Sequence, residues 1–332
     1  MRLLQYEIVT KLGVFKRLGN QIDDKIIDLN LAYVKYLVEE TKYKKVYSLA
    51  NLTIPPNMLS FLDGEESSFE AARKTNEFIS KFLKHNEKVI GPKQEQIILN
   101  LDEVRIIEPL GPRLIIDFLT FETHYKQGLH MLTDYSLWKK TPIAYKKNPT
   151  TIIGPTDDVI FPSSITKWLD YEVEFATVIG KKGKDIPEDE AYDYVAGYSV
   201  FNDFSARDIE LPEIMLRLGP FKSKDFDTAG AMGPCIVTGD ELTGHPSLEM
   251  ECRVNGITVQ KGNTKDMLWK VAQLVSYTSK DQTIYPGTVI LSGNPGKVKG
   301  VMKKAERLKV GNVIETEIER IGLLKNKVIA KE

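Results

Sequence analysis

The spacing of apolar residues predicts a small mixed unit at the start of the chain and a strand-rich unit after it. Short strands are predicted over Met1 to Val9 and Val14 to Leu29. Two helices follow, and the second is predicted to begin at Ser67, which has the S-x-x-E spacing of a capping box with Glu70. The apolar faces of these helices are Tyr33, Leu37 and Val38 in the first and Phe78, Ile79, Phe82 and Leu83 in the second.

From about Val104 the pattern changes to short β-prone runs separated by Gly and Pro. The Asn-Gly pair within Val254 to Ile257 predicts a type I′ hairpin, and one helix is predicted over Thr264 to Tyr277 with Thr264 as its cap. The segment EPLGP at 108–112 is a natural linker, so we divide the chain into residues 1–107 and residues 108–332. The predicted strands of the second unit are Arg113 to Phe118, Thr151 to Ile153, Glu172 to Ile179, Gly233 to Val237, Leu248 to Val259, Thr288 to Leu291 and Asn312 to Glu319.

Length and charge narrow the class of protein. A chain of 332 residues has room for two domains, and its 45 Lys and Arg nearly balance its 46 Asp and Glu, which argues against a nucleic-acid partner. No apolar run reaches the ~18 residues of a membrane span, and polar residues interrupt the first twelve positions, where a signal peptide needs a continuous apolar region. Cys235 and Cys252 have no metal-site spacing and are typical of a reducing compartment. We therefore expect a cytoplasmic protein with neither a membrane nor a nucleic-acid partner.

Two glutamates are the first candidates for chemistry. Side chains alternate between the two faces of a strand, so Glu172 and Glu174 share one face, which continues with Ala176 and Val178. Most strand glutamates face water, which is the simpler interpretation. Two adjacent acids on a partly apolar face are costly unless a cation or a proton neutralises them, so a cation site is the functional interpretation.

Three more segments concentrate polar groups. The run 202–208 follows an apolar stretch, where an ordinary turn is the alternative, and Asp117 interrupts another apolar run seven residues before His124. A lone histidine is usually a surface or satisfied core residue. The segment 292–297 superficially suggests a phosphate loop, but it lacks the G-x-x-x-x-G-K-[ST] spacing, so we exclude a nucleotide role.

The order of these segments resembles the fumarylacetoacetate hydrolase family of metal-dependent enzymes. Each motif is weak by itself, but their succession is specific and extends over about residues 104–325. In chain order, the motifs are E-x-E at Glu172 and Glu174, N-D-x-S-A-R-D at Asn202–Asp208, G-P-F-x-x-K-x-F-x-T at Gly219–Thr228, V-N-G at Val254–Gly256 and P-G-x-V-I-L-S-G at Pro286–Gly293.

The resemblance implies a β-rich α+β fold, with a mixed β-sandwich or roll as catalytic domain after a small N-terminal α+β domain, and a homodimer. It also implies that His124 activates the attacking water and that Lys224 assists catalysis. The implied metal ligands are Asp117, Glu172, Glu174 and Asp203, with Lys224 and Thr228 beside the metal, and the implied substrate contacts are Tyr145, Arg207, Glu210, Gly293 and Asn294. Because the donors are all oxygens, Mg²⁺ is the expected cofactor, with Mn²⁺ or Ca²⁺ as alternatives.

Several positions depart from the family pattern. The chain has Leu119, Glu210 and Asn294 where fumarylacetoacetase-type members have tyrosine, glutamine and threonine. It also has Gln127 where acylpyruvase-type members often place a glutamate three residues after the histidine. Glu122 and Glu306 are then the candidates for the carboxylate that orients His124.

We therefore expect a divalent-metal-dependent hydrolase that cleaves a carbon-carbon bond in a 1,3-diketo acid such as an acylpyruvate. The metal would polarise the substrate carbonyl and His124 would act as general base. One alternative is a lyase, hydratase, dehydratase or decarboxylase of a 2-oxo acid with the same metal site. Another is a metal-binding scaffold without catalysis.

Overall fold

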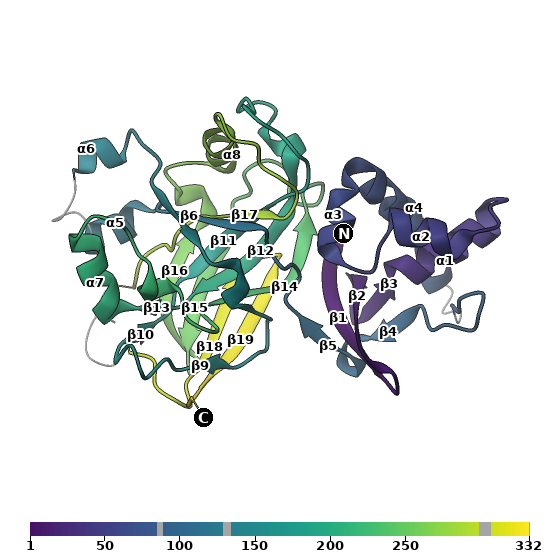
Figure 1. The fold of residues 1–332 in the computed structure, drawn as a ribbon, viewed down its shortest axis with the longest axis horizontal. Coiled ribbons are helices and arrows are strands. Elements are labelled where there is room, and N and C mark those ends of the chain that lie inside the picture. Colours follow the sequence, from purple (N-terminus) through teal and green to yellow (C-terminus); the bar gives the residue numbers. More distant parts are fainter. Residues whose placement is uncertain (85–88, 129–133, 299–306, 332) are drawn as a thin grey trace.

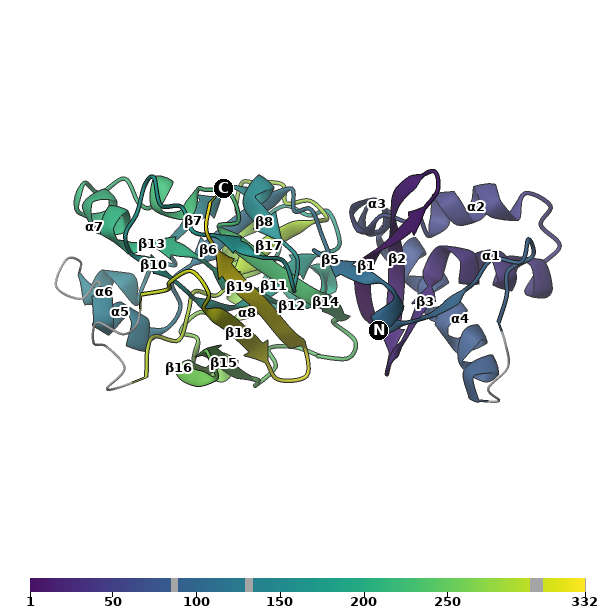
Figure 2. The same ribbon diagram turned by 90° about the horizontal axis from the view of Figure 1, so that it is seen from below.

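The computed structural model describes residues 1–84, 89–128, 134–298 and 307–331. A helix-bearing N-terminal part lies beside a larger strand-rich part in Figure 1, and Figure 2 shows the same arrangement from a second side. The N-terminal elements are β1 (Arg2–Thr10), β2 (Gly13–Ile22), β3 (Lys25–Asp28), α1 (Leu29–Glu40), α2 (Val46–Thr53), α3 (Met58–Asp63), α4 (Glu65–Lys84), β4 (Ile98–Asn100), η1 (Leu101–Glu103) and β5 (Arg105–Ile107).

One sheet runs through both parts of the chain. Its strands from the second part are β6 (Leu114–Phe118), β7 (Ala144–Lys147), β8 (Ile152–Ile153), β11 (Val173–Ile179), β12 (Val195–Asp203), β14 (Gly230–Thr238) and β17 (Thr288–Leu291). The strand order is β4-β3-β2-β1-β14-β12-β11-β17-β6-β7, with β5 paired to β1 and β8 paired to β14. Leu3 on β1 joins the two parts, because it lies opposite Asn20 on β2 and Ile236 on β14. The division after residue 107 stays a prediction.

A second sheet packs against the first. It contains β9 (Val159–Ile160), β15 (Glu249–Val254), β16 (Ile257–Asn263), β18 (Val313–Ile318) and β19 (Gly322–Ile329), in the order β16-β15-β18-β19-β9. Strands β11, β12 and β14 contact β15, β18 and β19, and the core between them includes Phe175, Tyr198 and Met250. The opposite face of β11 carries Ala176 and Val178, which belong to a separate apolar cluster, as the alternation predicts.

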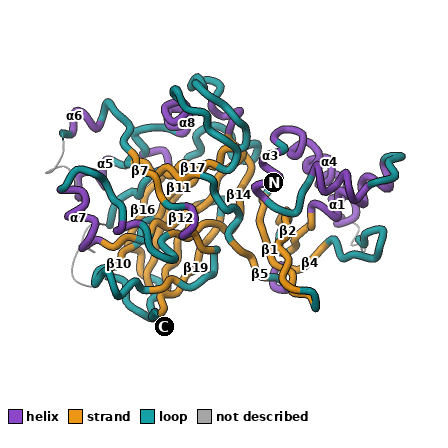
Figure 3. Tube along the Cα trace, in the orientation of Figure 1, coloured by secondary structure: helices purple, strands orange, loops and turns teal. Residues whose placement is uncertain are grey.

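The remaining elements surround these two sheets, and Figure 3 shows that most helices lie at the periphery. They are β10 (Leu169–Asp170), β13 (Ser205–Ala206), α5 (Glu122–Gly128), α6 (Tyr135–Trp138), α7 (Arg207–Met215), α8 (Val271–Ser279), η2 (Pro149–Thr151), η3 (Ala191–Tyr194), η4 (Lys222–Lys224) and η5 (Thr264–Asp266). Within the described ranges, no helix combines the length and apolar character that crossing a membrane requires. The prediction of a strand-rich α+β fold is confirmed.

The predicted hairpin is also confirmed. Val254 pairs with Ile257, and both turn residues between them have the positive φ that a type I′ turn requires, 51° at Asn255 and 80° at Gly256. The helix predicted at Ser67 begins earlier, at Glu65, and Ser67 Oγ donates to the carbonyl of Gly64 at 2.7 Å. The capping box is therefore wrong.

The helix predicted over Thr264 to Tyr277 is divided in the structure. Thr264 Oγ1 donates to the carbonyl of Pro246, and the backbone N–H of Leu268 donates to the carbonyl of Thr120 at 2.8 Å. These contacts with distant segments hold the chain away from helical geometry, so the regular helix begins only at Val271. The cap predicted at Thr264 is therefore wrong.

Candidate metal centre and substrate pocket

Three carboxylates meet where neighbouring strands of the main sheet lie side by side. Asp117 stands near the end of β6, Glu174 near the start of β11, and Asp203 at the end of β12. These strands are close because β17 pairs with both β6 and β11, and β11 pairs with β12. One oxygen from each of the three side chains lies within 4.8 Å of the others, and all three residues are buried.

The three buried carboxylates repel one another. Burial and the charge of Asp203 raise the pKa of Asp117 to about 8. Burial and the charges of Asp117 and Asp203 likewise raise the pKa of Glu174 well above its usual value. Glu174 is only 1% exposed, and its Oε2 accepts a hydrogen bond from the backbone N–H of Gly293 at 3.1 Å. Such a site favours either protons or a cation.

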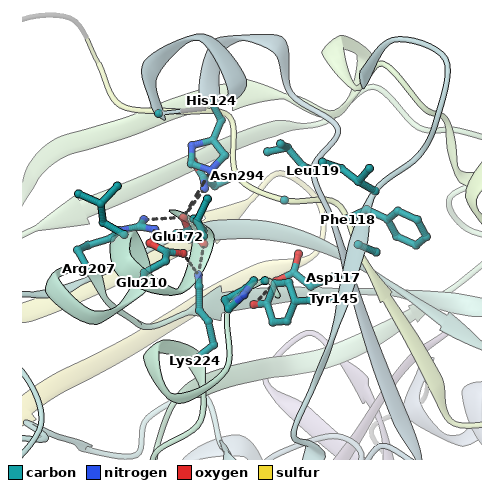
Figure 4. A pocket seen from close by; sticks show the side chains of 18 of the residues that line it. Asp117, Phe118, Leu119, His124, Tyr145, Glu172, Arg207, Glu210, Lys224 and Asn294 are labelled. Carbon is teal, nitrogen blue, oxygen red and sulfur yellow. Dashed lines mark hydrogen bonds and ion pairs between the residues drawn. The ribbon is translucent and has the colours of Figure 1, made fainter. Parts of the chain in front are cut away.

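Glu172 belongs to a different environment, although the sequence predicts it as a ligand together with Glu174. Its Oε1 accepts hydrogen bonds from Arg207 Nη2 at 2.5 Å and Asn294 Nδ2 at 2.7 Å, and its Oε2 accepts from Lys224 Nζ at 2.7 Å (Figure 4). Burial by itself raises the pKa of Glu172, but Arg207 and Lys224 outweigh it and hold the pKa below the usual range. Glu172 is therefore an ionised carboxylate that the protein already neutralises.

Two lysines neutralise Asp203. Lys224 on η4 reaches Oδ2 at 2.5 Å, and Lys147 on β7 reaches Oδ1 at 2.7 Å. Tyr145 donates toward both Asp203 Oδ2 and Asp117 Oδ2 at 2.8 Å. A single hydroxyl donates only one hydrogen at a time, so Tyr145 donates to one of the two acids and remains in contact with the other. Lys147 was not predicted, although it lies two residues after Tyr145 and so on the same face of β7.

The charge of the connected site suits a divalent cation. With every acid ionised, as when a cation displaces their protons, six carboxylates face four cationic side chains, which leaves two negative charges. The acids are Asp117, Asp170, Glu172, Glu174, Asp203 and Glu210, and the cations are Lys147, Arg207, Lys224 and Lys297. The three acids of the buried trio offer only oxygen donors, which are the ligands that Mg²⁺, Mn²⁺ and Ca²⁺ prefer. The residues present therefore fit a hard divalent metal ion.

His124 lies on α5 and faces Glu172, with its Nε2 3.8 Å from Oε1 (Figure 4). Its side chain is 25% exposed, and burial lowers the pKa of the imidazole more than the charge of Glu172 raises it. The side chain is therefore neutral near pH 7 and able to accept a proton. Glu172 is the acid that faces this ring, and sequence reasoning assigned it a different role.

The two acids predicted to orient His124 do not supply that contact. Glu122 pairs with Tyr135 and Lys126 instead, and Glu306 lies outside the described residues. The side-chain amide of Gln127 forms two hydrogen bonds with the backbone of Lys297. Its oxygen accepts from the N–H at 2.8 Å, and its nitrogen donates to the carbonyl at 2.9 Å. This double contact fixes α5, and so His124, against the loop that follows β17.

The predicted substrate contacts Arg207 and Glu210 are occupied within the protein. Arg207 donates to Asp170 at 2.8 Å and to Glu210 at 2.6 Å, in addition to its bond with Glu172. Glu210 also lies 3.7 Å from Lys224. Through these ion pairs, Arg207 and Glu210 hold Glu172 and Lys224 in place.

Gly293 and Asn294 also hold the site together. Asn294 accepts from Gln260 Nε2 at 3.1 Å while it donates to Glu172. Gly293 has a φ of 73°, and a Cβ there would lie 2.3 Å from the carbonyl oxygen of Phe118, so a glycine is required. Thr228, predicted beside the metal, instead accepts from the backbone N–H of Ile160 at 3.0 Å, and among the described residues it does not line the pocket.

An open cavity of about 1330 Å³ leads to this cluster. The residues that line it include the buried acids Asp117, Glu172 and Glu174 and the less buried apolar residues Leu119 and Ile143. Leu119, one of the departures from the family pattern, thus lines the pocket without closing it.

The fold and the site define the class of protein. It is a strand-rich enzyme whose pocket reaches buried acids suited to a divalent cation. The chain belongs to the fumarylacetoacetate hydrolase family, because the family model described as fumarylacetoacetate (FAA) hydrolase C-terminal matches residues 114–329. The family resemblance predicted from the motifs is therefore confirmed.

Individual relatives differ in the reactions that their names describe. The human mitochondrial oxaloacetate tautomerase FAHD2A is 42% identical over 281 residues, which cover 83% of this chain and 81% of that protein. The fumarylacetoacetate hydrolase of Exiguobacterium antarcticum has a TM-score of 0.71 at 25% identity, with both chains covered completely. Maleylpyruvate hydrolase from Sphingobium sp. SYK-6, described in complex with manganese(II) and pyruvate, has a TM-score of 0.69 at 23% identity over the full length of both chains, and shows likeness of fold.

These comparisons identify an enzyme family without fixing one reaction for this chain. A cytoplasmic location stays a prediction, since FAHD2A is named as mitochondrial. The homodimer also stays a prediction.

Proposed function

We propose that this chain is a divalent-metal-dependent enzyme that interconverts the keto and enol forms of a short 2-oxo acid, with oxaloacetate as the first candidate. The name of the human relative supports the reaction type. The observation that carries the proposal is the imidazole of His124, 3.8 Å from the carboxylate of Glu172, in a pocket that these residues line together with Asp117 and Glu174. This arrangement suits a proton transfer that needs no second reactant.

The proposed steps move one proton. His124 accepts the proton from the carbon next to the substrate carbonyl, which leaves an enolate. The negative charge of Glu172, 3.8 Å away, stabilises the imidazolium that forms. His124 then returns the proton to the enolate oxygen, so that no atom is gained or lost. A positioned general base of this kind typically contributes about 10² to 10⁴ in rate.

Asp117, Glu174 and Asp203 are the proposed metal-holding residues, and Lys224 connects Glu172 to Asp203. A bound divalent metal supplies Lewis acidity for the carbonyl and the enolate oxygen. We propose Mg²⁺ first, with Mn²⁺ or Ca²⁺ as alternatives, because hard oxygen donors accept all three. Tyr145 links Asp117 to Asp203 and so keeps two of the proposed ligands together.

Hydrolytic cleavage of a carbon-carbon bond in a 1,3-diketo acid is the second candidate. It is favoured by the size of the cavity, about 1330 Å³, which is large for oxaloacetate and leaves room for a longer acyl group and a water molecule. In that reaction His124 would accept a proton from water, and the product enolate would need the same metal. The two candidates differ in their products, because hydrolysis adds water and splits the substrate into two acids, whereas tautomerisation leaves one acid of unchanged mass.

The test follows the ultraviolet absorbance of enol oxaloacetate with Mg²⁺ or Mn²⁺ and with EDTA, while acetylpyruvate is assayed in parallel and products are identified by mass. We expect metal-dependent loss of the enol at a rate above that of the metal ion in buffer. His124→Gln should lower the rate at least about 10²-fold, whereas His245→Gln should retain it, because His245 forms a hydrogen bond with the carbonyl of Thr264 and does not line the pocket. Two acids from acetylpyruvate, with no effect on oxaloacetate, would favour the hydrolase instead.

A further inference from the structure

Lys147 is a cationic residue whose side chain is completely buried in the site. Its side chain is 0% exposed, and its Nζ lies 2.7 Å from Asp203 Oδ1 and 3.0 Å from the carbonyl oxygen of Lys224. Isolated buried ammonium groups are costly, so a lysine with no solvent contact is retained only where its partners hold it. Lys147 differs from Lys224, which lines the pocket.

The main sheet provides a slot for this side chain. Asp203 on β12 lies opposite Gly230 on β14, and a Cβ at Gly230 would lie 3.2 Å from Lys147 Cε. It would also meet the side chains of Phe201 and Ile152 at 2.6 and 2.7 Å. A larger residue at 230 would therefore crowd the lysine stem. The glycine leaves the room that Lys147 needs to reach Asp203.

The two oxygens of Asp203 consequently have different surroundings. Oδ1 faces Lys147, which does not line the pocket, whereas Oδ2 faces two residues that do, Lys224 at 2.5 Å and the hydroxyl of Tyr145, which also contacts Asp117. Oδ2 is thus the oxygen on the side of the other buried acids. As long as Lys147 holds Oδ1, Asp203 can offer a metal ion only Oδ2, the oxygen that Lys224 and Tyr145 contact from the pocket side in the metal-free protein.

We propose that Lys147 is a positioning residue that reserves Asp203 Oδ1, so that Asp203 binds the metal through Oδ2 alone and the site favours Mg²⁺ over Ca²⁺. This inference rests on the metal site of the proposed function. Mg²⁺ demands near-octahedral coordination by few protein oxygens, while Ca²⁺ accepts six to eight oxygens and often takes both oxygens of one carboxylate. A carboxylate restricted to one oxygen therefore discriminates against the larger ion.

The ratio of the Mg²⁺ affinity to the Ca²⁺ affinity distinguishes this positioning role of Lys147 from a role in charge balance alone. Removing the charge of Lys147 leaves the site more negative, which strengthens the binding of all divalent cations alike and leaves their ratio unchanged. Freeing Oδ1 strengthens Ca²⁺ binding specifically. The ratio of the Mg²⁺ dissociation constant to the Ca²⁺ dissociation constant is therefore the quantity to measure.

The experiment titrates the metal-free full chain with MgCl₂ and with CaCl₂ by isothermal calorimetry, for the wild type and for Lys147→Met and Lys147→Gln. We expect the ratio to move toward Ca²⁺ by at least about 10-fold in both variants, in line with the effect of outer-shell partners on metal sites. Lys325→Met is the matched control, because Lys325 also pairs with a strand carboxylate, Glu315 at 3.2 Å, but at the surface. A ratio within 2-fold of the wild type in the Lys147 variants would overturn the inference.

A crystal structure of the wild type with Mn²⁺ makes the inference independent of whether the variants fold. We expect the ion on Asp203 Oδ2, with Lys147 still bonded to Oδ1. An ion held by both oxygens of Asp203 would overturn the role of Lys147 and leave the metal site standing. A wild type that binds neither Mg²⁺ nor Ca²⁺ in the titration would instead refute the metal site itself.

Discussion

Glu172 and Glu174 lie two residues apart, and the structure predicts opposite consequences for removing their charges. Glu174 is buried against Asp117 and Asp203, with one hydrogen bond from a backbone N–H, and its pKa is raised by burial and by those acids. In the metal-free protein it therefore prefers the protonated form, which Gln imitates closely. We expect Glu174→Gln to change the metal-free stability by less than about 1 kcal/mol.

Glu172→Gln removes a partner from two buried cations, Lys224 and Arg207. Breaking a buried ion pair typically costs about 3–5 kcal/mol, because the remaining charges stay buried without compensation. In EDTA the Glu172 variant should therefore be clearly destabilised and the Glu174 variant should not.

In the presence of metal, Glu174→Gln is expected to lower the stability relative to the wild type. A ligand present at 100 times its dissociation constant stabilises the folded state by about 2.7 kcal/mol. We expect the wild type to gain this amount from Mg²⁺ and Glu174→Gln to gain almost nothing, measured by thermal and urea unfolding followed by circular dichroism. Full Mg²⁺ stabilisation of the Glu174 variant, or a loss of stability in EDTA equal to that of the Glu172 variant, would refute the reasoning.

Three further predictions concern the same site. The pKa of Asp117 is raised to about 8, so between about pH 4 and pH 8 the metal-free folded state retains a proton that the unfolded state has lost. Metal-free stability should therefore fall as the pH rises through this range, and the Mg²⁺-induced rise in melting temperature should be larger at pH 8 than at pH 6; an equal rise would contradict the shift. His124→Gln should lower turnover at least about 10²-fold with Mg²⁺ affinity unchanged in calorimetry, and a parallel loss of both would remove the general-base role. Gly293→Ala should lower the melting temperature and weaken Mg²⁺ binding, since the added Cβ would lie 2.3 Å from the carbonyl oxygen of Phe118, and a variant identical to the wild type would exclude the predicted clash.

Local patterns predict much of this fold. The Asn255-Gly256 turn needs two positive φ values, which Asn and Gly adopt readily, so the hairpin is encoded by its own residues. The helix predicted at Thr264 failed because distant partners, Pro246 and Thr120, determine the backbone there. Local sequence contains no information about such partners.

The site shows the same division between local and distant information. The alternation that places Glu172 and Glu174 on one face is local, and the resemblance to the family singled out Asp117 and Asp203. Their different roles were not predictable, because Glu172 is neutralised by Arg207, 35 residues away, and Glu174 is not. Lys147 was missed because a lysine on a short strand ordinarily faces solvent, and only the slot in the sheet reveals its burial.

The central claim is that bound metal and His124 together drive keto-enol exchange of a 2-oxo acid. The most direct measurement is the rate of loss of enol oxaloacetate by the purified full chain with Mg²⁺, with EDTA, and with Mg²⁺ for the variant Glu174→Gln. We predict a rate above that of free Mg²⁺ only for the metal-loaded wild type. A wild-type rate that survives EDTA, or one that never exceeds that of Mg²⁺ in buffer, would contradict the claim.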